Sequence, residues 1–95
     1  MKYKLVVKKS AAGLGLFAGE DIPRGVRIIE YVGERISADE ANRRGGKYLF
    51  EVTDTVTIDG KDRTNTARYI NHACIPNGEM QNHNNRIFYY SRSEE

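Results

Sequence analysis

The pattern of apolar and polar positions changes at short intervals along the 95 residues, and glycines interrupt it repeatedly. Short runs rich in β-branched and aromatic residues between such interruptions are typical of β-strands. The pattern predicts strands at residues 3–7, 26–32, 48–53, 55–59 and 86–91. We therefore expect a mainly β fold made of short strands.

One segment, residues 37–44, has the pattern of a helix. Ser37 can cap its first turn, Glu40 follows three residues later as in a capping box, and two glycines after residue 44 can end it. Glycine and proline predict turns at residues 11–15 and 21–25. Residues 16–18 form a brief apolar stretch, and residues 65–69 are expected to form a short helical turn. One short helix among many strands is expected, in a single domain covering residues 1–95.

Composition narrows the class of protein only moderately. An apolar fraction of 39% and a charged fraction of 29% are typical of a soluble globular chain, and the net charge of +2 is too small to indicate nucleic-acid binding. No apolar run approaches the roughly 20 residues that span a membrane. The single cysteine, Cys74, excludes an internal disulfide and favours a reducing, intracellular location.

Two short segments could carry chemistry. Gly13 and Gly15 let the backbone turn tightly or approach a ligand, although no strand–turn–helix unit of the dinucleotide-binding type surrounds them. The segment Asn71-His72-Ala73-Cys74 admits a His/Cys dyad, a zinc site completed by His83, or a purely structural role in which the cysteine is a small buried apolar residue. The residues alone leave these alternatives open.

Taken together, five segments are more specific than any one of them. They are "GLGLFAGEDIPRG", "IIEYVGE", "KYLFEV", "TIDG" and "NTARYINHACIPN", in this order along the chain. In order and approximate spacing they resemble the motifs of SET domains, the catalytic domains of histone lysine methyltransferases and of compact bacterial SET proteins. The resemblance runs from about residue 6 to residue 92. It implies a SET-type β-clip fold of short strands in small sheets.

The resemblance also implies an enzyme that transfers a methyl group from S-adenosylmethionine to a lysine side chain of a histone or another protein. In that family, the residues matching six positions here contact the cofactor, partly through their main chain: Ala12, Gly13, Leu14, Tyr48, Asn71 and His72. Family members often carry polar or basic residues where this chain has Ala12 and Leu14, so only main-chain contacts are expected there. The substrate would be a protein or peptide bearing lysine.

Tyr31, in "EYVGE", matches a tyrosine that lines the lysine channel, and it is the expected catalytic residue. A free lysine has a pKa of about 10.4, so losing its proton at pH 7 costs on the order of 4–5 kcal/mol. An apolar channel and a nearby cation lower that pKa. A tyrosine, with an ordinary pKa near 10, suits orienting the amine by a hydrogen bond rather than acting as a base. The acidic side chains of Glu30, Glu34 and Asp59 are expected to be superficial or structural.

Cys74 matches the cysteine of the family's N-H-x-C motif, which in many members shares a zinc ion with three cysteines beyond the domain. This sequence has no other cysteine, so no metal is expected. Ala73 replaces a common serine.

The resemblance stops before the family's last motif, a "GEELTYDY"-like stretch that supplies a further tyrosine and threads through the fold as a pseudoknot. From the ending "SRSEE" we expect a C-terminally shortened domain that binds cofactor weakly, turns over little and self-associates through the exposed edge. The alternative is a non-catalytic peptide- or protein-binding module on a degenerate SET scaffold. An intracellular location would be cytoplasmic in a bacterium and nuclear or chromatin-associated in a eukaryote.

Overall fold

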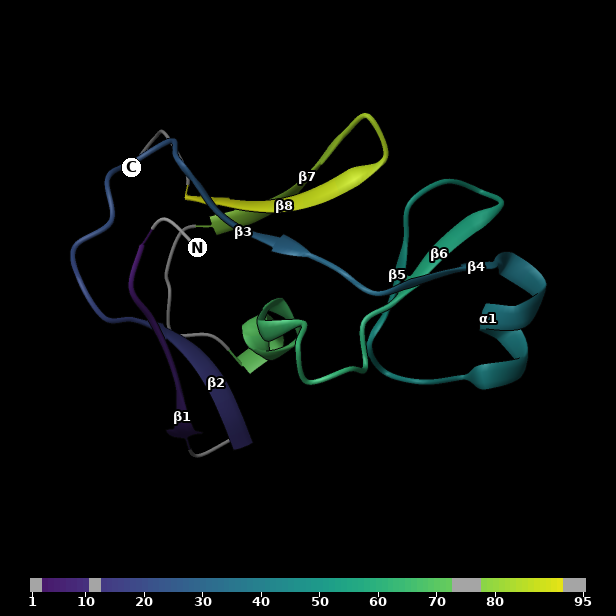
Figure 1. The fold of residues 1–95 in the computed structure, drawn as a ribbon, viewed down its shortest axis with the longest axis horizontal. Helices are drawn as coiled ribbons and strands as arrows, with labels where there is room; N and C mark the ends of the chain where they lie inside the picture. The colour runs from purple at the N-terminus through teal and green to yellow at the C-terminus, as the bar shows by residue number, and fades with distance from the viewer. Residues whose placement is uncertain (1–2, 11–12, 73–77, 92–95) are drawn as a thin grey trace.

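The computed structural model describes residues 3–10, 13–72 and 78–91, which form three small antiparallel sheets (Figure 1). The first sheet is a hairpin of β1 (Leu5–Ser10) and β2 (Gly13–Ala18). The second has the strand order β3 (Arg27–Tyr31), β8 (Arg86–Ser91), β7 (Gly78–His83). The third has the order β4 (Glu34–Ser37), β6 (Val56–Asp59), β5 (Leu49–Glu51). The expectation of a mainly β fold in small sheets is confirmed.

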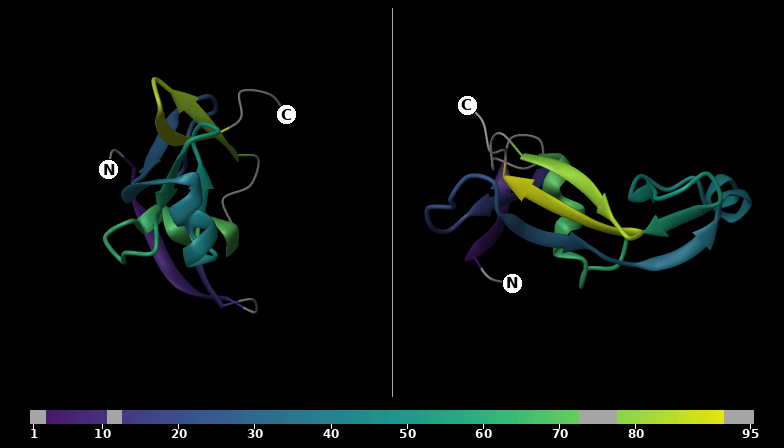
Figure 2. Two further views of the ribbon diagram at one scale, coloured as in Figure 1. Left: turned by 90° about the vertical axis from the view of Figure 1, so that its right-hand side faces the viewer. Right: turned by 90° about the horizontal axis from the view of Figure 1, so that it is seen from above.

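Two helical elements complete the fold: the α-helix α1 (Ala38–Arg44) and the 3₁₀-helix η1 (Thr66–His72). The elements β4, α1, β5 and β6 form a lobe, here called the α1 lobe (residues 34–59), which projects from one end of the molecule (Figure 1 and the right view of Figure 2). The helix η1 lies near the centre, where it packs against β2, β3 and β1. Strands from distant parts of the sequence therefore surround η1.

The sequence predicts α1 and β8 well because the signals for both are local. Ser37 Oγ accepts a hydrogen bond from the Glu40 backbone N–H at 3.1 Å, and Gly45 ends the helix in the left-handed conformation with φ of 60°. The Glu40 carboxylate is bound by Arg43 and Arg44.

Among the described residues, no helix has the length and apolar character needed to cross a bilayer.

Three strands differ from the expectation. The segment around Gly13 and Gly15, predicted to be a turn, is the first half of β2, because the reversal occurs between Ser10 and Gly13 instead. The strands β4 and β7 were not predicted. Only Ile36 is buried in β4, and β7 is a polar strand at a sheet edge, so neither shows a clear apolar alternation.

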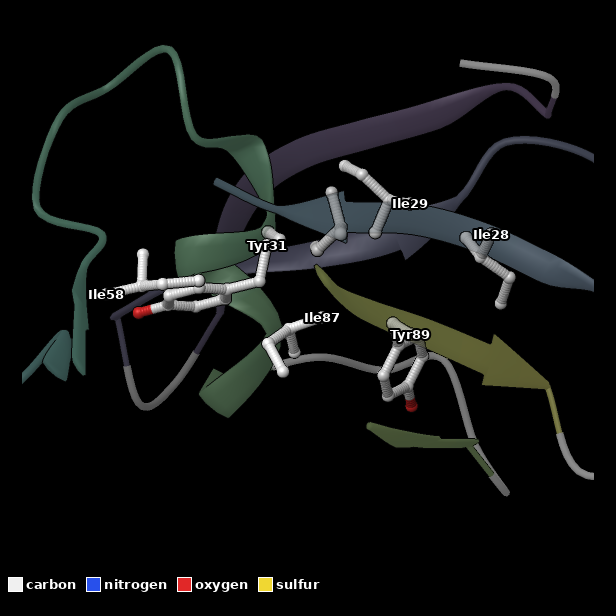
Figure 3. Close-up of a cluster of buried hydrophobic side chains, with 8 residues drawn as sticks. Ile28, Ile29, Tyr31, Ile58, Ile87 and Tyr89 are labelled. Atoms are coloured by element: carbon white, nitrogen blue, oxygen red, sulfur yellow. The ribbon is translucent and has the colours of Figure 1, made fainter. Parts of the chain in front are cut away.

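The apolar core joins the β3–β8 sheet to β2, β6 and η1 (Figure 3). Its most deeply buried members, with exposed fractions of 1% or less, are Leu16, Ile58, Ala67 and Ile87. The ring of Tyr31 extends from β3 toward Ile58 in the α1 lobe, so one aromatic side chain connects the lobe to the rest of the core (Figure 3). Packing at Tyr31 therefore couples the two parts of the molecule.

Arg44, at the end of α1, holds the α1 lobe together. Its guanidinium pairs with the carboxylates of Glu34 on β4, Glu40 on α1 and Asp59 on β6, at 2.9, 2.8 and 2.9 Å. Hydrogen bonds from Arg44 lower the pKa of Glu34 and of Glu40 below the ordinary value of 4.5. A carboxyl group whose pKa is lower in the folded state than in the unfolded state stabilises the fold at pH values above the unfolded-state pKa. This stabilisation is lost as the pH falls through the folded-state pKa.

We therefore expect the urea midpoint of the wild type to fall as pH drops below about 4.5, and this fall to be smaller in Arg44→Gln. The measurement is urea unfolding, followed by circular dichroism, at a series of pH values. Arg43→Gln is the matched control, because Arg43 is more exposed and pairs with Glu40 alone of the three carboxylates. An acid dependence that is the same in wild type and Arg44→Gln would contradict the assignment.

Candidate active site

Tyr31 ends β3 at the junction with the α1 lobe and has an exposed fraction of 7%. Its hydroxyl donates a hydrogen bond to the Tyr48 carbonyl oxygen at 2.6 Å. Its ring packs against Phe50 at a centroid distance of 5.6 Å and an interplanar angle of 42°. The hydroxyl is thus held in one direction by the backbone, and the ring is held by a second aromatic residue.

Burial, assisted by the nearby acidic groups of Asp59 and Tyr48, raises the pKa of Tyr31 to about 12, with Arg68 acting in the opposite sense. The hydroxyl therefore stays protonated at neutral pH and cannot serve there as a general base. Because its proton is directed at the Tyr48 carbonyl, its oxygen lone pairs can accept a hydrogen bond from an incoming N–H donor.

Tyr48 precedes β5 and contributes to the site through its carbonyl and its ring. The carbonyl oxygen accepts a second hydrogen bond, from the Gly60 N–H, at 2.9 Å. The half-buried ring lies 4.5 Å from the Arg68 guanidinium and 5.2 Å from the Lys47 ammonium. The structure thus brings together Tyr31 and Tyr48, two of the site residues expected from the sequence.

Arg68 connects η1 to this pair of tyrosines. Its guanidinium also lies 5.1 Å from the ring of Tyr69, and one of its terminal nitrogens donates to the Lys61 carbonyl. Its Nε is buried and lacks a hydrogen-bond partner among the described residues. A planar guanidinium stacked on aromatic rings fixes both the rings and the helix that carries it.

The segment expected to contact the cofactor falls on η1 and the residues after it. Asn71 and His72 form the last two positions of this helix, and only their backbone is described. Cys74 and Ala73 lie outside the described residues. The roles of Asn71 and His72 therefore remain predictions, while η1, the helix that ends with them, packs against β2 and β3.

The glycine-containing segment also lies on an element that contacts η1. Gly13 and Leu14 begin β2, and β2 packs against η1. Gly13 has a φ of 113°, a backbone conformation that favours glycine, and a Cβ atom built on it would meet none of the described residues within 4 Å. Leu14 has an exposed fraction of 47%. Ala12 lies outside the described residues.

The sequence did not identify Asn65, Gly60, Arg68 or Phe50 as parts of the site. Asn65 was expected only to begin a helical turn, yet it is fully buried and hydrogen-bonded on both sides of its amide. The sequence signal that could have found it is weak: a polar residue directly before a short helix normally indicates a cap. Its contacts depend on pairings between distant segments.

Within residues 3–10, 13–72 and 78–91, no cluster of three or more His, Cys, Asp or Glu side chains is arranged to hold a metal ion. His83 instead shares a hydrogen bond with Gln81 at 2.8 Å and packs against Tyr90 on the face of the β7–β8 hairpin.

Known proteins resemble this chain in sequence. The sequence model of the SET domain family matches residues 13–94. A histone-lysine N-methyltransferase described as H3 lysine-4 specific, from Chaetomium globosum, is 42% identical over 72 residues, which is 66% of this chain and 7% of that protein. The histone-lysine N-methyltransferase ASHH3 of Arabidopsis thaliana is 38% identical over 90 residues, 85% of this chain and 25% of that protein.

A solved structure agrees with these sequence matches. A chain in a humanized mutant of the Chaetomium thermophilum Polycomb Repressive Complex 2, bound to an inhibitor, superposes with a TM-score of 0.75 and is 37% identical. The match covers 96% of this chain and 13% of that one. This protein belongs to the SET domain family, and its fold is the SET fold. It spans a quarter or less of the length of the curated relatives described above.

Proposed function

We propose that this chain is the SET-type catalytic domain of a protein-lysine N-methyltransferase. The observation that carries the proposal is the Tyr31 hydroxyl, which is neutral at pH 7 and directs its proton at the Tyr48 carbonyl. Its oxygen is left as an acceptor, which is what a lysine amine with N–H donors requires for orientation. Relatives at 42% and 38% identity are named as histone-lysine N-methyltransferases, which supports the same reaction here.

The cofactor in this proposal is S-adenosylmethionine, which supplies an electrophilic methyl group on a sulfonium sulfur. The absence of a side chain at Gly13 and the aromatic ring of Tyr48 are compatible with a bound molecule of this kind. The cofactor would be held by the main chain at Ala12, Gly13 and Leu14, by Tyr48, and by Asn71 and His72 on η1. Of these residues, Gly13 and Leu14 belong to β2, Tyr48 lies in the segment before β5, and Asn71 and His72 end η1.

The protein's contribution to the reaction is alignment more than acid–base chemistry. The amine must arrive as the neutral form, and an apolar, aromatic surround such as Tyr31 with Phe50 disfavours its charged form. A hydrogen bond from the amine to the Tyr31 oxygen then points the nitrogen lone pair along a single direction. Such alignment can supply a large share of the rate enhancement. With Tyr31 as an acceptor, the proton released by lysine goes to solvent.

The substrate class follows from the relatives. Their names specify histone lysine, so we propose a lysine on a histone or similar protein as the acceptor, and a location at chromatin where that substrate is found.

The test of the proposal is binding of S-adenosylmethionine by isothermal titration calorimetry, combined with methyl transfer from radiolabelled cofactor to histone peptides. We expect Asn71→Ala to weaken cofactor binding by at least about tenfold, which is a loss of about 1.4 kcal/mol. Asn42→Ala is the matched control, because Asn42 is exposed on α1, outside the candidate site. Equal binding by wild type and Asn71→Ala would contradict the cofactor assignment. Cofactor or peptide binding without transfer would favour a non-catalytic module.

A further inference from the structure

Asn65 is fully buried between the end of β6 and the start of η1, and both sides of its amide are used. Its Oδ1 accepts a hydrogen bond from the Val32 backbone N–H at 3.0 Å. Its Nδ2 donates to the Gly60 carbonyl at 3.0 Å. A single side chain therefore joins the segment directly after Tyr31 to the segment directly after β6.

Gly60 carries this connection to the Tyr31 hydroxyl. Its N–H donates to the Tyr48 carbonyl at 2.9 Å, and the same oxygen accepts the Tyr31 hydroxyl at 2.6 Å. Gly60 also lies directly against both partners. A Cβ atom at this position would be 2.6 Å from Cε1 and Cζ of the Tyr31 ring and would overlap Nδ2 of Asn65.

We propose that Asn65 is a positioning residue for the Tyr31 hydroxyl. It acts on Tyr31 from two sides: through the Val32 N–H it fixes the backbone immediately after the ring, and through Gly60 it fixes the carbonyl that receives the hydroxyl proton. The importance of this geometry for the reaction rests on the proposed function, in which the Tyr31 oxygen orients the lysine amine. The positioning itself is a property of the chain alone.

The chemistry at position 65 restricts which side chains can do this. The side chain at position 65 has to accept a hydrogen bond from Val32 and donate one to Gly60. A primary amide does both, because its oxygen and nitrogen lie in one plane at about the same distance from the residue's own Cα. Aspartate would keep the acceptor but place an oxygen against the Gly60 carbonyl. Serine is too short to reach both partners. The bond to Gly60 is buried and the bond to Val32 is partly buried, so losing the first leaves a buried carbonyl without a partner and losing the second leaves an N–H that water reaches only in part.

The test uses the full chain labelled with ¹³C at Cζ of tyrosine, observed by NMR near pH 7. We expect Asn65→Ser to shift the Cζ resonance of Tyr31, because the direction and strength of its hydroxyl hydrogen bond change. Asn82→Ser is the matched control: Asn82 also donates from Nδ2 to a backbone carbonyl, that of Val52 at 3.2 Å, but it is exposed and contacts neither Gly60 nor Tyr48. An unchanged Tyr31 resonance in folded Asn65→Ser would overturn the proposal.

The reciprocal variant protects the test against loss of folding in Asn65→Ser. Tyr31→Phe removes only the hydroxyl, and we expect it to shift the Gly60 amide proton and the Asn65 side-chain NH₂ resonances. Resonances unmoved by this change would also overturn the proposal. Neither measurement needs cofactor. If the resonances shift as expected but no methyl transfer is detected, the proposed function is contradicted and the positioning role of Asn65 is not. Where transfer is measurable, Asn65→Ser should lower kcat by up to about 100-fold, with a much smaller change in KM.

Discussion

Replacing Ile58 by alanine is expected to lower the free energy of unfolding by about 2–5 kcal/mol. Ile58 lies on the central strand of the β4–β6–β5 sheet, has an exposed fraction of 1%, and faces the Tyr31 side chain (Figure 3). Alanine would leave a cavity at the point where the α1 lobe packs against the rest of the core. Since a domain of this size is stable by only about 5–15 kcal/mol, the loss is a large fraction of the total.

The measurement is urea unfolding, followed by circular dichroism and by the intrinsic fluorescence of tyrosine, which is undisturbed because the chain has no tryptophan. Ile58→Val should cost only about 0.5–1.5 kcal/mol, because it removes one methylene group. Val7→Ala, on the exposed face of β1, should change stability by less than about 0.5 kcal/mol. An Ile58→Ala variant as stable as Val7→Ala would show that this part of the core does not stabilise the fold.

The second large effect is expected at Gly33, between β3 and β4. A Cβ atom there would overlap the Asp59 carbonyl oxygen and lie 2.8 Å from its carbonyl carbon. These are backbone atoms of the neighbouring strand, so no side chain can move aside to make room. Gly33→Ala is therefore expected to destabilise the protein by about 3 kcal/mol, at the upper end of the range for overpacked sites.

Gly46 is the matched control for Gly33. A Cβ atom at Gly46 would meet nothing within 4 Å, and its backbone φ lies outside the left-handed region. Gly46→Ala should therefore stabilise the protein by about 0.4–1 kcal/mol, because alanine restricts the unfolded chain. The two substitutions are chemically identical and are expected to have opposite signs in the same unfolding assay. A shared sign or equal magnitudes would contradict the packing described at Gly33.

The parts of the fold that were predicted from the sequence are those with local causes. The helix α1 is determined by Ser37 at one end and Gly45 at the other, and β8 by a continuous run of apolar and aromatic residues. The strand β7 was missed because its sequence, GEMQNH, is polar and only Met80 packs against the core. It becomes a strand through pairing with β8 across the turn at Asn84 and Asn85, which both have positive φ.

The candidate site was only partly predictable for a similar reason. Motif resemblance identified Tyr31 and Tyr48, which the structure places in direct hydrogen-bond contact. It gave no indication of Asn65 or Gly60, because a buried amide and a closely packed glycine acquire their roles from three segments that are far apart in the sequence. No pattern within a short window distinguishes such residues from an ordinary cap or turn.

The pairing of β3 with β8 has a consequence for how the chain folds. The ion pair between Glu30 and Arg86 joins residues 56 positions apart, whereas the strands and helix of the α1 lobe pair within residues 34–59. Closing the longer loop costs more chain entropy, and contacts of high sequence separation slow folding. The α1 lobe can therefore assemble early, and the central sheet has to wait for β8. During synthesis on a ribosome, the surface around Tyr31 would be completed only after β8 has been made.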